Sequence, residues 1–371
     1  MKKPPLAPQS ATVDFLFNAM KSVRLVIIGT GGMANVHAEQ FRAIRSCKLV
    51  AAVDIDKKRV RAFSKKHEIP EAFTDVKELL RKVEFDAVTI VTPDAFHAPI
   101  AIQCLKAGKH VLCEKPLATN YPDAKKMVAA ARKAGVINMV NFTYRNWPAL
   151  QAVKELVEKG TIGDIRHVDA SYLQAWLISR AWGNWRKEAL WLWRLSTKHG
   201  SKGVLGDVGV HILDFVTFPV GAIKSVFCRL KSFPKAPGNR IGEYPLDAND
   251  SAVLNVEFQN GALGSIHTTR WCGGHENRLF LKISGTKGSV EFDSDKSIDN
   301  YKISIGKDID KGIWKSKKAR AVPSVFQCFI RSIQTGKQLQ PDFARGAEIQ
   351  KILDASFVSD SKNRPVTIPK A

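Results

Sequence analysis

Two short segments carry side chains whose types could do chemistry together. The first, CEKP at residues 113–116, closes an apolar run that is typical of a buried strand, and ligands of doubly wound sheets bind beyond such strand ends. The second, residues 203–214, is expected to be helical, which would place Asp207, His211 and Asp214 at i, i+4 and i+7 on one face. An imidazole with an ordinary pKa near 6.5 can exchange a proton at neutral pH. The helical segment alone is explained more simply by a helix cap and an interior histidine, so the hypothesis rests on both segments.

The polar residues of the helical segment could instead hold a metal ion. Asp207, His211 and Asp214 are of the types that zinc or iron accepts. A catalytic zinc needs three converging ligands and an open position. Asp214 is explained more simply by an interaction with the N-terminal part of the chain, so we expect no metal.

A glycine-rich turn near the start of the chain predicts a dinucleotide site. GTGGMA at residues 29–34 has the pattern GxGxxA and lies between a strand-like run at 23–28 and a helical stretch. The first glycine permits the tight turn, the second lets the backbone approach a pyrophosphate, and the alanine allows close helix packing. The helix N-terminus offers free N–H groups to the phosphates. The alternative is a glycine turn without a ligand. The residues of this turn expected at the cofactor are Gly29, Gly31, Gly32 and Met33.

An acid at the end of the second predicted strand indicates which dinucleotide binds. Asp54 closes the run at 48–54, and a carboxylate there can accept both ribose hydroxyls. It would repel a 2′-phosphate, so NAD is favoured over NADP. Lys57, Lys58 and Arg59 follow directly and keep NADP as the less favoured alternative.

Strands and helices alternate through the first part of the chain, which predicts a parallel, doubly wound Rossmann sheet. The second part has consecutive short strands with tight turns, which predicts an α+β domain with a large, mainly antiparallel sheet. The fold class is therefore α/β with two domains. We expect a loose extension at 1–20, an NAD-binding domain at 21–143 and a substrate-binding and oligomerisation domain at 144–371. Expected strands are 23–28, 48–54, 85–93, 110–116, 136–142, 164–176, 223–233, 250–258, 262–271, 278–285 and 288–293, and expected helices include 57–68, 97–109, 123–135, 147–160, 204–218, 321–335 and 344–359.

Together these motifs resemble the glucose–fructose oxidoreductase/inositol dehydrogenase/MocA (Gfo/Idh/MocA) family over nearly the whole chain. The resemblance is carried by the GxGxxA turn, the acid after the second strand, residues 92–118 with their EKP, the GDxGxH pattern at 206–211, and the closing segment 341–356. Lys202 stands where the family usually has the first glycine of a pair, a departure in loop geometry. The resemblance implies oxidation or reduction of a secondary alcohol on a sugar, sugar derivative or cyclitol by direct hydride transfer.

The resemblance also implies roles for single residues. Lys115, Asp207 and His211 would form the catalytic site and contact the substrate. His211 would accept the hydroxyl proton, a role worth about 10²–10⁴-fold in rate. Lys115 would stabilise the developing alkoxide, and Asp207 would bind a neighbouring hydroxyl or orient the imidazole. Residues implied around the nicotinamide ribose are Thr92, Pro93, His97 and Asn141, and Glu114 and Lys115 are also implied at the cofactor. Tyr144 and Arg145 are expected to edge the substrate pocket. His97 could equally be a helix-start residue.

A tryptophan-rich segment at 176–194 precedes the predicted catalytic helix. It holds five of the eight tryptophans, interleaved with three arginines. Aromatic faces pack on sugar rings and arginines bind hydroxyls or anions, so a substrate loop is one interpretation; core filling, a subunit contact and nucleic-acid stacking are the others. We expect most of these tryptophans to be structural, Trp185 to contact the substrate and Arg194 to be its principal polar contact.

The chain of 371 residues carries a formal charge of +22, with a local excess at 307–320. The basic residues are spread along the chain without a nucleic-acid module, so nucleic-acid binding is disfavoured, while an anionic substrate group stays possible.

No apolar run approaches the ~20 residues of a membrane span. Six scattered cysteines fit a reducing compartment, and we expect a cytoplasmic protein. One sheet face should remain for pairing, which predicts a homodimer or homotetramer.

Three alternative functions stay open. A tightly held, recycled NAD could support glycosidase-type chemistry. A nucleotide-sugar dehydrogenase of the same fold would suit the positive charge. A non-catalytic NAD-binding sensor or scaffold is disfavoured because both the lysine and the histidine are present.

Overall fold

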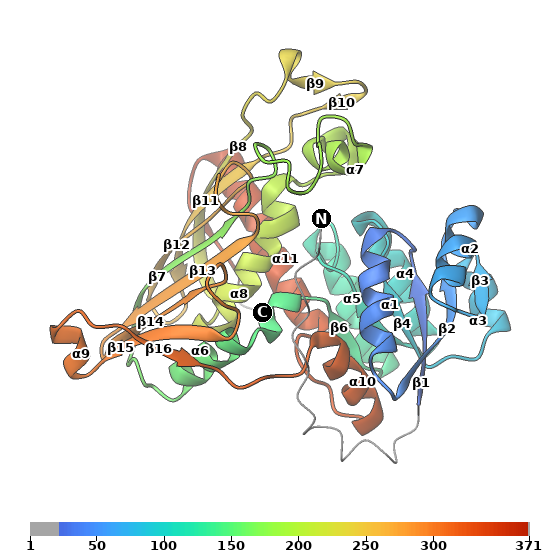
Figure 1. Cartoon of the computed structure of the whole chain (residues 1–371), viewed down its shortest axis with the longest axis horizontal. Helices are drawn as coiled ribbons and strands as arrows, with labels where there is room; N and C mark the ends of the chain where they lie inside the picture. The colour runs from blue at the N-terminus through green and yellow to red at the C-terminus, as the bar shows by residue number, and fades with distance from the viewer. Residues whose placement is uncertain (1–21, 370–371) are drawn as a thin grey trace.

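The computed structural model describes residues 22–369, and the extension predicted for 1–20 lies outside this range. Figure 1 shows two sheets side by side, a parallel sheet coloured blue to teal and a larger sheet at the left, with the long helix α11 (Phe343–Lys362) between them. The chain thus forms two lobes. The predicted boundary at residue 143 remains a prediction, because later helices pack against the first lobe.

The N-terminal sheet has six parallel strands in the order β3-β2-β1-β4-β5-β6. The order reverses at the β1/β4 pair, which is the switch point where such sheets bind nucleotides. The predicted Rossmann sheet is confirmed. Its strands are β1 (Val23–Ile28), β2 (Cys47–Val53), β3 (Glu71–Phe73), β4 (Ala87–Ile90), β5 (His110–Cys113) and β6 (Asn138–Val140). Strand β3 was not predicted, since two of its three side chains are exposed.

Helices cover both faces of this sheet, because alternate side chains of a strand enter opposite cores. Leu25 and Ile27 of β1 pack in one core, and Val26 and Ile28 pack in the other. The first core also takes its apolar side chains from helix α10 (Val325–Thr335), near the end of the chain. The other helices of this lobe are α1 (Gly32–Arg42), α2 (Lys57–Lys66), α3 (Val76–Lys82), α4 (His97–Lys106) and α5 (Tyr121–Ala134).

The C-terminal sheet has nine strands in the order β16-β15-β14-β13-β7-β12-β11-β8-β17. All neighbours are antiparallel except β7 and β12, which are parallel. The prediction of a mainly antiparallel sheet is confirmed. Its strands are β7 (Ile165–Leu173), β8 (Ile223–Lys231), β11 (Ser251–Phe258), β12 (Leu263–Thr269), β13 (Arg278–Gly285), β14 (Gly288–Asp293), β15 (Asn300–Ile305), β16 (Lys315–Lys318) and β17 (Val366–Thr367).

Three helices cover one face of the large sheet: α6 (Pro148–Glu158), α8 (Val210–Val220) and α11. Helix α11 also contacts α5 and β6 of the Rossmann lobe, so a single apolar core runs from one lobe into the other. This arrangement holds the two lobes against each other. Smaller elements are β9 (Arg240–Ile241), β10 (Tyr244–Pro245), α7 (Ala189–Leu192) and α9 (Lys307–Asp310).

The predicted helix at 204–218 begins with an irregular turn. Leu205–Gly209 is π-helical and leads directly into α8. π-Helical turns inside α-helices occur frequently at functional sites. The expected regular spacing between Asp207 and His211 is therefore altered by the wider turn.

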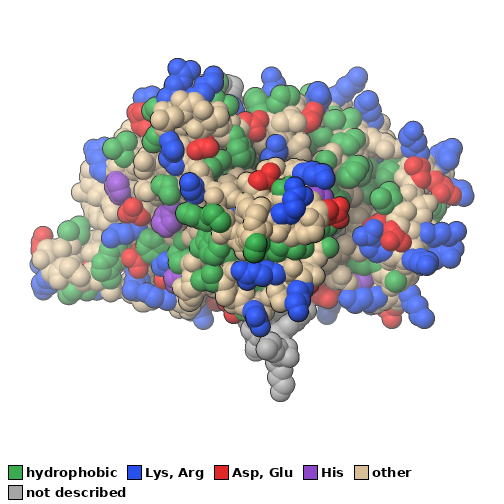
Figure 2. All heavy atoms as spheres, turned by 90° about the horizontal axis from the view of Figure 1, so that it is seen from above, with side chains coloured by type: hydrophobic (Ala, Val, Ile, Leu, Met, Phe, Trp, Pro, Cys, Tyr) green, Lys and Arg blue, Asp and Glu red, His purple; other side chains and the backbone are tan. Residues whose placement is uncertain are grey.

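The surface is basic but mixed. Figure 2 shows Lys and Arg side chains distributed over the whole visible face, with Asp, Glu and hydrophobic side chains between them. No single basic patch dominates this face. Among the described helices, none combines the length and the apolar character that crossing a bilayer requires.

Candidate active site

The two predicted segments meet where the lobes face each other. Lys115 follows β5 of the Rossmann sheet, and its Nζ donates to the Asp207 backbone carbonyl at 3.0 Å and to Asp207 Oδ1 at 3.3 Å. The acceptor carbonyl lies in the π-helical turn before α8. The amine side chain is largely buried, with 20% of its surface exposed. Asp207 and the charges near it raise the pKa of Lys115 against the opposing effect of burial, so the amine stays protonated.

Asp207 is surrounded by cations. Its Oδ2 accepts from Arg270 Nη2 at 2.9 Å and lies 3.9 Å from Arg194 Nε. Burial would raise the pKa of this carboxyl, but Lys115, Arg270 and Arg194 together hold it well below its usual range. The carboxylate is therefore ionised over the whole working pH range and fixes the Lys115 amine by its charge.

His211 lies on α8 in a largely buried position, 8% exposed. Burial, with a smaller contribution from the Lys115 charge, lowers the pKa of His211 to about 3. Its ring centroid is 4.6 Å from that of Tyr144 and 6.3 Å from that of Tyr172, and its Nδ1 has no hydrogen-bond partner within residues 22–369. A neutral imidazole with an unsatisfied nitrogen can take part in proton transfer.

A closed hydrogen-bond network fixes Tyr144 and Tyr172, the two rings next to His211. The Tyr144 and Tyr172 hydroxyls lie 2.8 Å apart, and Tyr172 donates to Asn277 Oδ1 at 2.6 Å. Asn277 Nδ2 donates to the Tyr144 hydroxyl at 3.1 Å, and Gln174 Nε2 donates to Asn277 Oδ1 at 2.9 Å. Of these residues the sequence indicates only Tyr144. Its hydroxyl group is held by this network, which fixes the ring against which His211 packs.

A second network lies in the Rossmann lobe, next to Lys115. Glu114 Oε1 is 2.8 Å from His37 Nε2 and accepts from Asn141 Nδ2 at 2.6 Å. His37 Nδ1 is 2.8 Å from the Thr89 hydroxyl. Burial would raise the pKa of Glu114, but the bonds and charges of His37 and Lys115 lower it to about 2. Glu114 and Asn141, both predicted at the cofactor, are thus joined side by side at the carboxyl ends of β5 and β6.

The glycine turn fits a bound dinucleotide. Gly29 has φ +92°, and a Cβ there would lie 2.6 Å from the Val91 carbonyl oxygen, so only glycine is tolerated. A Cβ at Gly31 or Gly32 would meet nothing within 4 Å, which leaves open space beside the backbone. No side chain caps the N-terminus of α1 and its first turn holds no acid. Its free N–H groups can therefore receive a pyrophosphate.

Asp54 stands beside this turn as predicted, but it is already engaged. Its Oδ2 accepts from Thr30 N and from Thr30 Oγ1, both at 2.8 Å. Its Oδ1 accepts from Asp56 N at 3.0 Å and lies 3.3 Å from Arg59 Nη2. The carboxylate is thus oriented by the turn, with a cation next to it.

Three predicted site residues have their polar groups directed elsewhere. The ring nitrogens of His97 lie 2.9 Å from the Thr92 carbonyl oxygen and 2.8 Å from that of Pro116, which favours the helix-start interpretation. Trp185 is 3% exposed and its indole N–H donates to a backbone carbonyl within the tryptophan-rich segment, so it lies in a small core. Arg145 pairs with Asp214 of α8. Thr92 and Pro93 follow β4, and Met33 is 51% exposed at the start of α1.

Asp214 does not converge with Asp207 and His211. It pairs with Arg145 and with Arg345 from α11. Within the described residues no group of three or more His, Cys, Asp or Glu side chains could hold a metal ion.

Arg270 and His37 are the principal residues that the motifs did not indicate. Arg270 is fully buried, donates to Asp207 and to the Arg194 carbonyl at 3.1 Å, and lies 4.9 Å from the Trp176 ring. No apolar alternation marks Arg270, which directly follows β12, because the buried positions around it include Gly264 and Thr268 while Leu263 is exposed. His37 does have a signal, since it shares the face of α1 that carries Ala34, Ala38 and Phe41.

A Rossmann sheet with a dinucleotide-fitting turn, facing a lysine from one lobe and a histidine from the other, defines an NAD-binding oxidoreductase. Comparison with known proteins agrees. Residues 23–142 match the oxidoreductase family with an NAD-binding Rossmann fold, and residues 150–291 match the GFO/IDH/MocA C-terminal domain. The chain belongs to the Gfo/Idh/MocA family of oxidoreductases.

Two curated relatives are informative. The chain is 26% identical to levoglucosan dehydrogenase of Pseudarthrobacter phenanthrenivorans over 399 residues, covering 95% of this chain and 99% of that protein. It is 30% identical to myo-inositol 2-dehydrogenase of Thermotoga maritima over 284 residues, covering 73% and 75%. Among solved structures, a complex of levoglucosan dehydrogenase with NADH and L-sorbose has a TM-score of 0.84 at 26% identity, covering 95% of this chain and 100% of that one.

Proposed function

We propose that this protein oxidises or reduces a secondary alcohol of a sugar, sugar derivative or cyclitol, using NAD(H) and direct hydride transfer. The observation that carries the proposal is the contact of the Lys115 amine with Asp207 across the lobes, beside His211. The named relatives act, by their names, on levoglucosan and myo-inositol. Both are polyhydroxylated rings with secondary alcohols, which supports this substrate class.

In this mechanism the protein supplies charge and a proton acceptor. Bound NAD would accept a hydride at nicotinamide C4, or donate one in reverse. The Lys115 ammonium hydrogen-bonds the reacting oxygen and stabilises its developing negative charge, a contribution of about 3–4 kcal/mol for comparable donors. Asp207 holds the amine in place and can accept from a neighbouring hydroxyl.

His211 accepts the hydroxyl proton. Its pKa of about 3 makes it a weak base before substrate binds. The imidazole is therefore neutral near pH 7 and able to accept a proton. An alkoxide forming within reach of the ring raises its proton affinity, because a nearby negative charge favours imidazolium. His211 therefore takes up the proton as negative charge develops on the substrate oxygen.

Isotope transfer tests the proposal. A panel of sugars and cyclitols is screened by NADH fluorescence, and an oxidised substrate is then deuterated at its reacting carbon. Deuterium should appear at C4 of the reduced cofactor, and its appearance in solvent instead would exclude direct transfer. His211→Ala and Lys115→Ala should lower kcat while NADH still binds. A loss of cofactor binding with chemistry intact at saturating NAD would contradict these roles.

We also propose that a second copy of this chain packs on the large sheet. The face away from α6, α8 and α11 carries exposed apolar side chains, Leu263 at 59% and Val253 at 48%. A homodimer or homotetramer would cover them. Light scattering should give a multiple of the chain mass, and Leu263→Lys should reduce it. A monomer at micromolar concentration would refute the proposal.

A further inference from the structure

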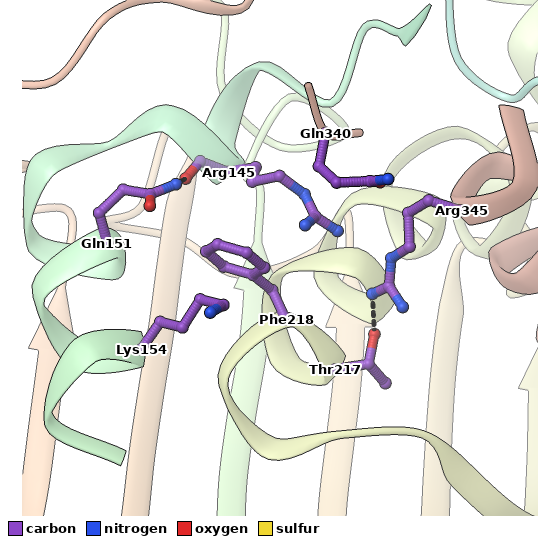
Figure 3. A pocket seen from close by; sticks show the side chains of 7 residues that line it. All are labelled: Arg145, Gln151, Lys154, Thr217, Phe218, Gln340 and Arg345. Atoms are coloured by element: carbon purple, nitrogen blue, oxygen red, sulfur yellow. Dashed lines mark hydrogen bonds between the residues drawn. The ribbon is translucent and has the colours of Figure 1, made fainter. Parts of the chain in front are cut away.

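A cavity lies toward the C-terminal end of α8, beyond His211 along the helix. It has a volume of about 400 Å³, within the size range of small-molecule sites. Figure 3 shows the side chains of Arg145, Lys154 and Arg345 directed toward one space, with the Phe218 ring between them. None of Lys115, Asp207 or His211 lines it. The remaining lining residues are Gln151, Thr217 and Gln340.

The charge balance of this cavity favours an anion. Two guanidiniums share one buried acid: Asp214 accepts from Arg145 Nε at 3.0 Å and from Arg345 Nε at 2.7 Å. The arginine side chains are only 6% and 14% exposed, so their attraction for an anion is weakly screened. Two positive groups against one negative leave a net positive charge at the floor of the cavity.

A third cation, Lys154, also lines the cavity, and two acids lie at its rim. Lys154 pairs with Glu158, whose side chain is 62% exposed, and Arg345 pairs with Glu348, 50% exposed, at 3.2 Å. Such solvent-exposed pairs contribute at most ~1 kcal/mol, so these acids at the rim compete weakly with a ligand. Lys154 Nζ lies 5.2 Å from the centroid of the Phe218 ring, which brings its charge over the cavity.

Donors remain available to such a ligand. Arg145 uses Nε and Nη2 for Asp214, and within residues 22–369 no hydrogen bond occupies its Nη1. Its guanidinium lies 4.2 Å from the Phe218 ring centroid, which fixes its plane. The nitrogens of Arg345 donate to Asp214, Glu348 and Thr217. The donors left for phosphate oxygens are therefore Arg145 Nη1 and the remaining protons of Lys154 Nζ.

We infer that this cavity binds a phosphate group, either free phosphate or the phosphate of a small phosphorylated molecule. The site is separate from Lys115, Asp207 and the glycine turn, none of which lines it. It lies further along α8, because its lining residues Thr217 and Phe218 follow His211 by six and seven residues.

Calorimetric titration of the NADH-saturated protein with inorganic phosphate tests this, with ionic strength held constant by NaCl. Saturating NADH removes binding at the glycine turn. Lys154→Gln should weaken phosphate binding about tenfold or more, the loss of one charge-assisted bond. Lys159→Gln is the matched control, since Lys159 lies at the end of the same helix, pairs with Glu155 and does not line the cavity.

Two results would overturn the inference: no saturable binding of phosphate to the wild type, or equal affinity of the Lys154→Gln variant and the wild type. A parallel titration with glycerol 3-phosphate separates the two ligand sources. Tighter binding of the monoester assigns the cavity to phosphorylated molecules, and tighter binding of inorganic phosphate assigns it to the free ion. Circular dichroism of both variants verifies that the fold is retained.

Discussion

Replacing His211 by Gln should remove a pH-dependent part of the protein's stability. The pKa of His211 is about 3 in the folded protein, because burial disfavours the imidazolium, and about 6.5 in an unfolded chain. Between these pH values the unfolded chain binds a proton at this residue and the folded protein does not. Stability must therefore fall as pH falls from 6.5 toward 3.

The size of the effect follows from the two pKa values. At pH 5 the imidazole lies about 1.5 pH units below its unfolded pKa, which corresponds to about 2 kcal/mol at 1.36 kcal/mol per unit. A glutamine at position 211 does not titrate, so it adds no pH-dependent free energy. The free energy of unfolding of the wild type should thus drop by about 2 kcal/mol more than that of His211→Gln between pH 7.5 and pH 5.

Urea unfolding followed by circular dichroism at pH 7.5, 6 and 5, at constant ionic strength, measures this difference. His167→Gln controls for the loss of one histidine, since His167 lies exposed on the large sheet, 55% of its side chain accessible. Parallel pH curves for the wild type and His211→Gln would refute the assignment of a buried neutral imidazole. An equal effect of His167→Gln would refute its specificity.

Three further predictions concern the candidate active site and the glycine turn. Lys115→Met should lower kcat about 10²–10³-fold, because a donor to the reacting oxygen is lost, with NADH affinity within a few-fold by fluorescence titration; an unchanged kcat would contradict its role. Arg270→Leu should destabilise the protein by about 1.5–3 kcal/mol, because Asp207 keeps Lys115 and Arg194 but loses one charge-assisted hydrogen bond; thermal unfolding measures this, and a neutral effect would contradict the role of this pair. Asp54→Ala should weaken NADH binding about tenfold and narrow the preference over NADPH in paired titrations, whereas equal losses for both cofactors would refute selection by charge.

Much of the fold could be predicted because its signals are local. The apolar run at Val23–Ile28 matches β1 residue for residue, and glycines that permit tight turns follow it. Short elements such as β3 carry too few apolar side chains to be recognised. The parallel pairing of β7 and β12 brings together strands that are distant in sequence, which periodicity within either strand does not encode.

The site was predictable only where motifs placed its residues at element ends. Lys115 and Asp207 come from such motifs, and they meet. Arg270 and Asp207 are 63 residues apart, so only the tertiary fold reveals their pairing. Trp185 shows the opposite difficulty, because a tryptophan suits a sugar face and a core equally well, and its local sequence does not distinguish the two.

The position of α10 has a consequence for synthesis. Phe326 and Phe329 of this helix pack on Phe41 of α1, with ring centroids 5.2 and 6.4 Å apart. The ribosome makes these partners almost three hundred residues after α1. A nascent Rossmann lobe must therefore emerge with the apolar surface around Phe41 exposed to solvent. It stays an incomplete folding unit until translation has nearly ended.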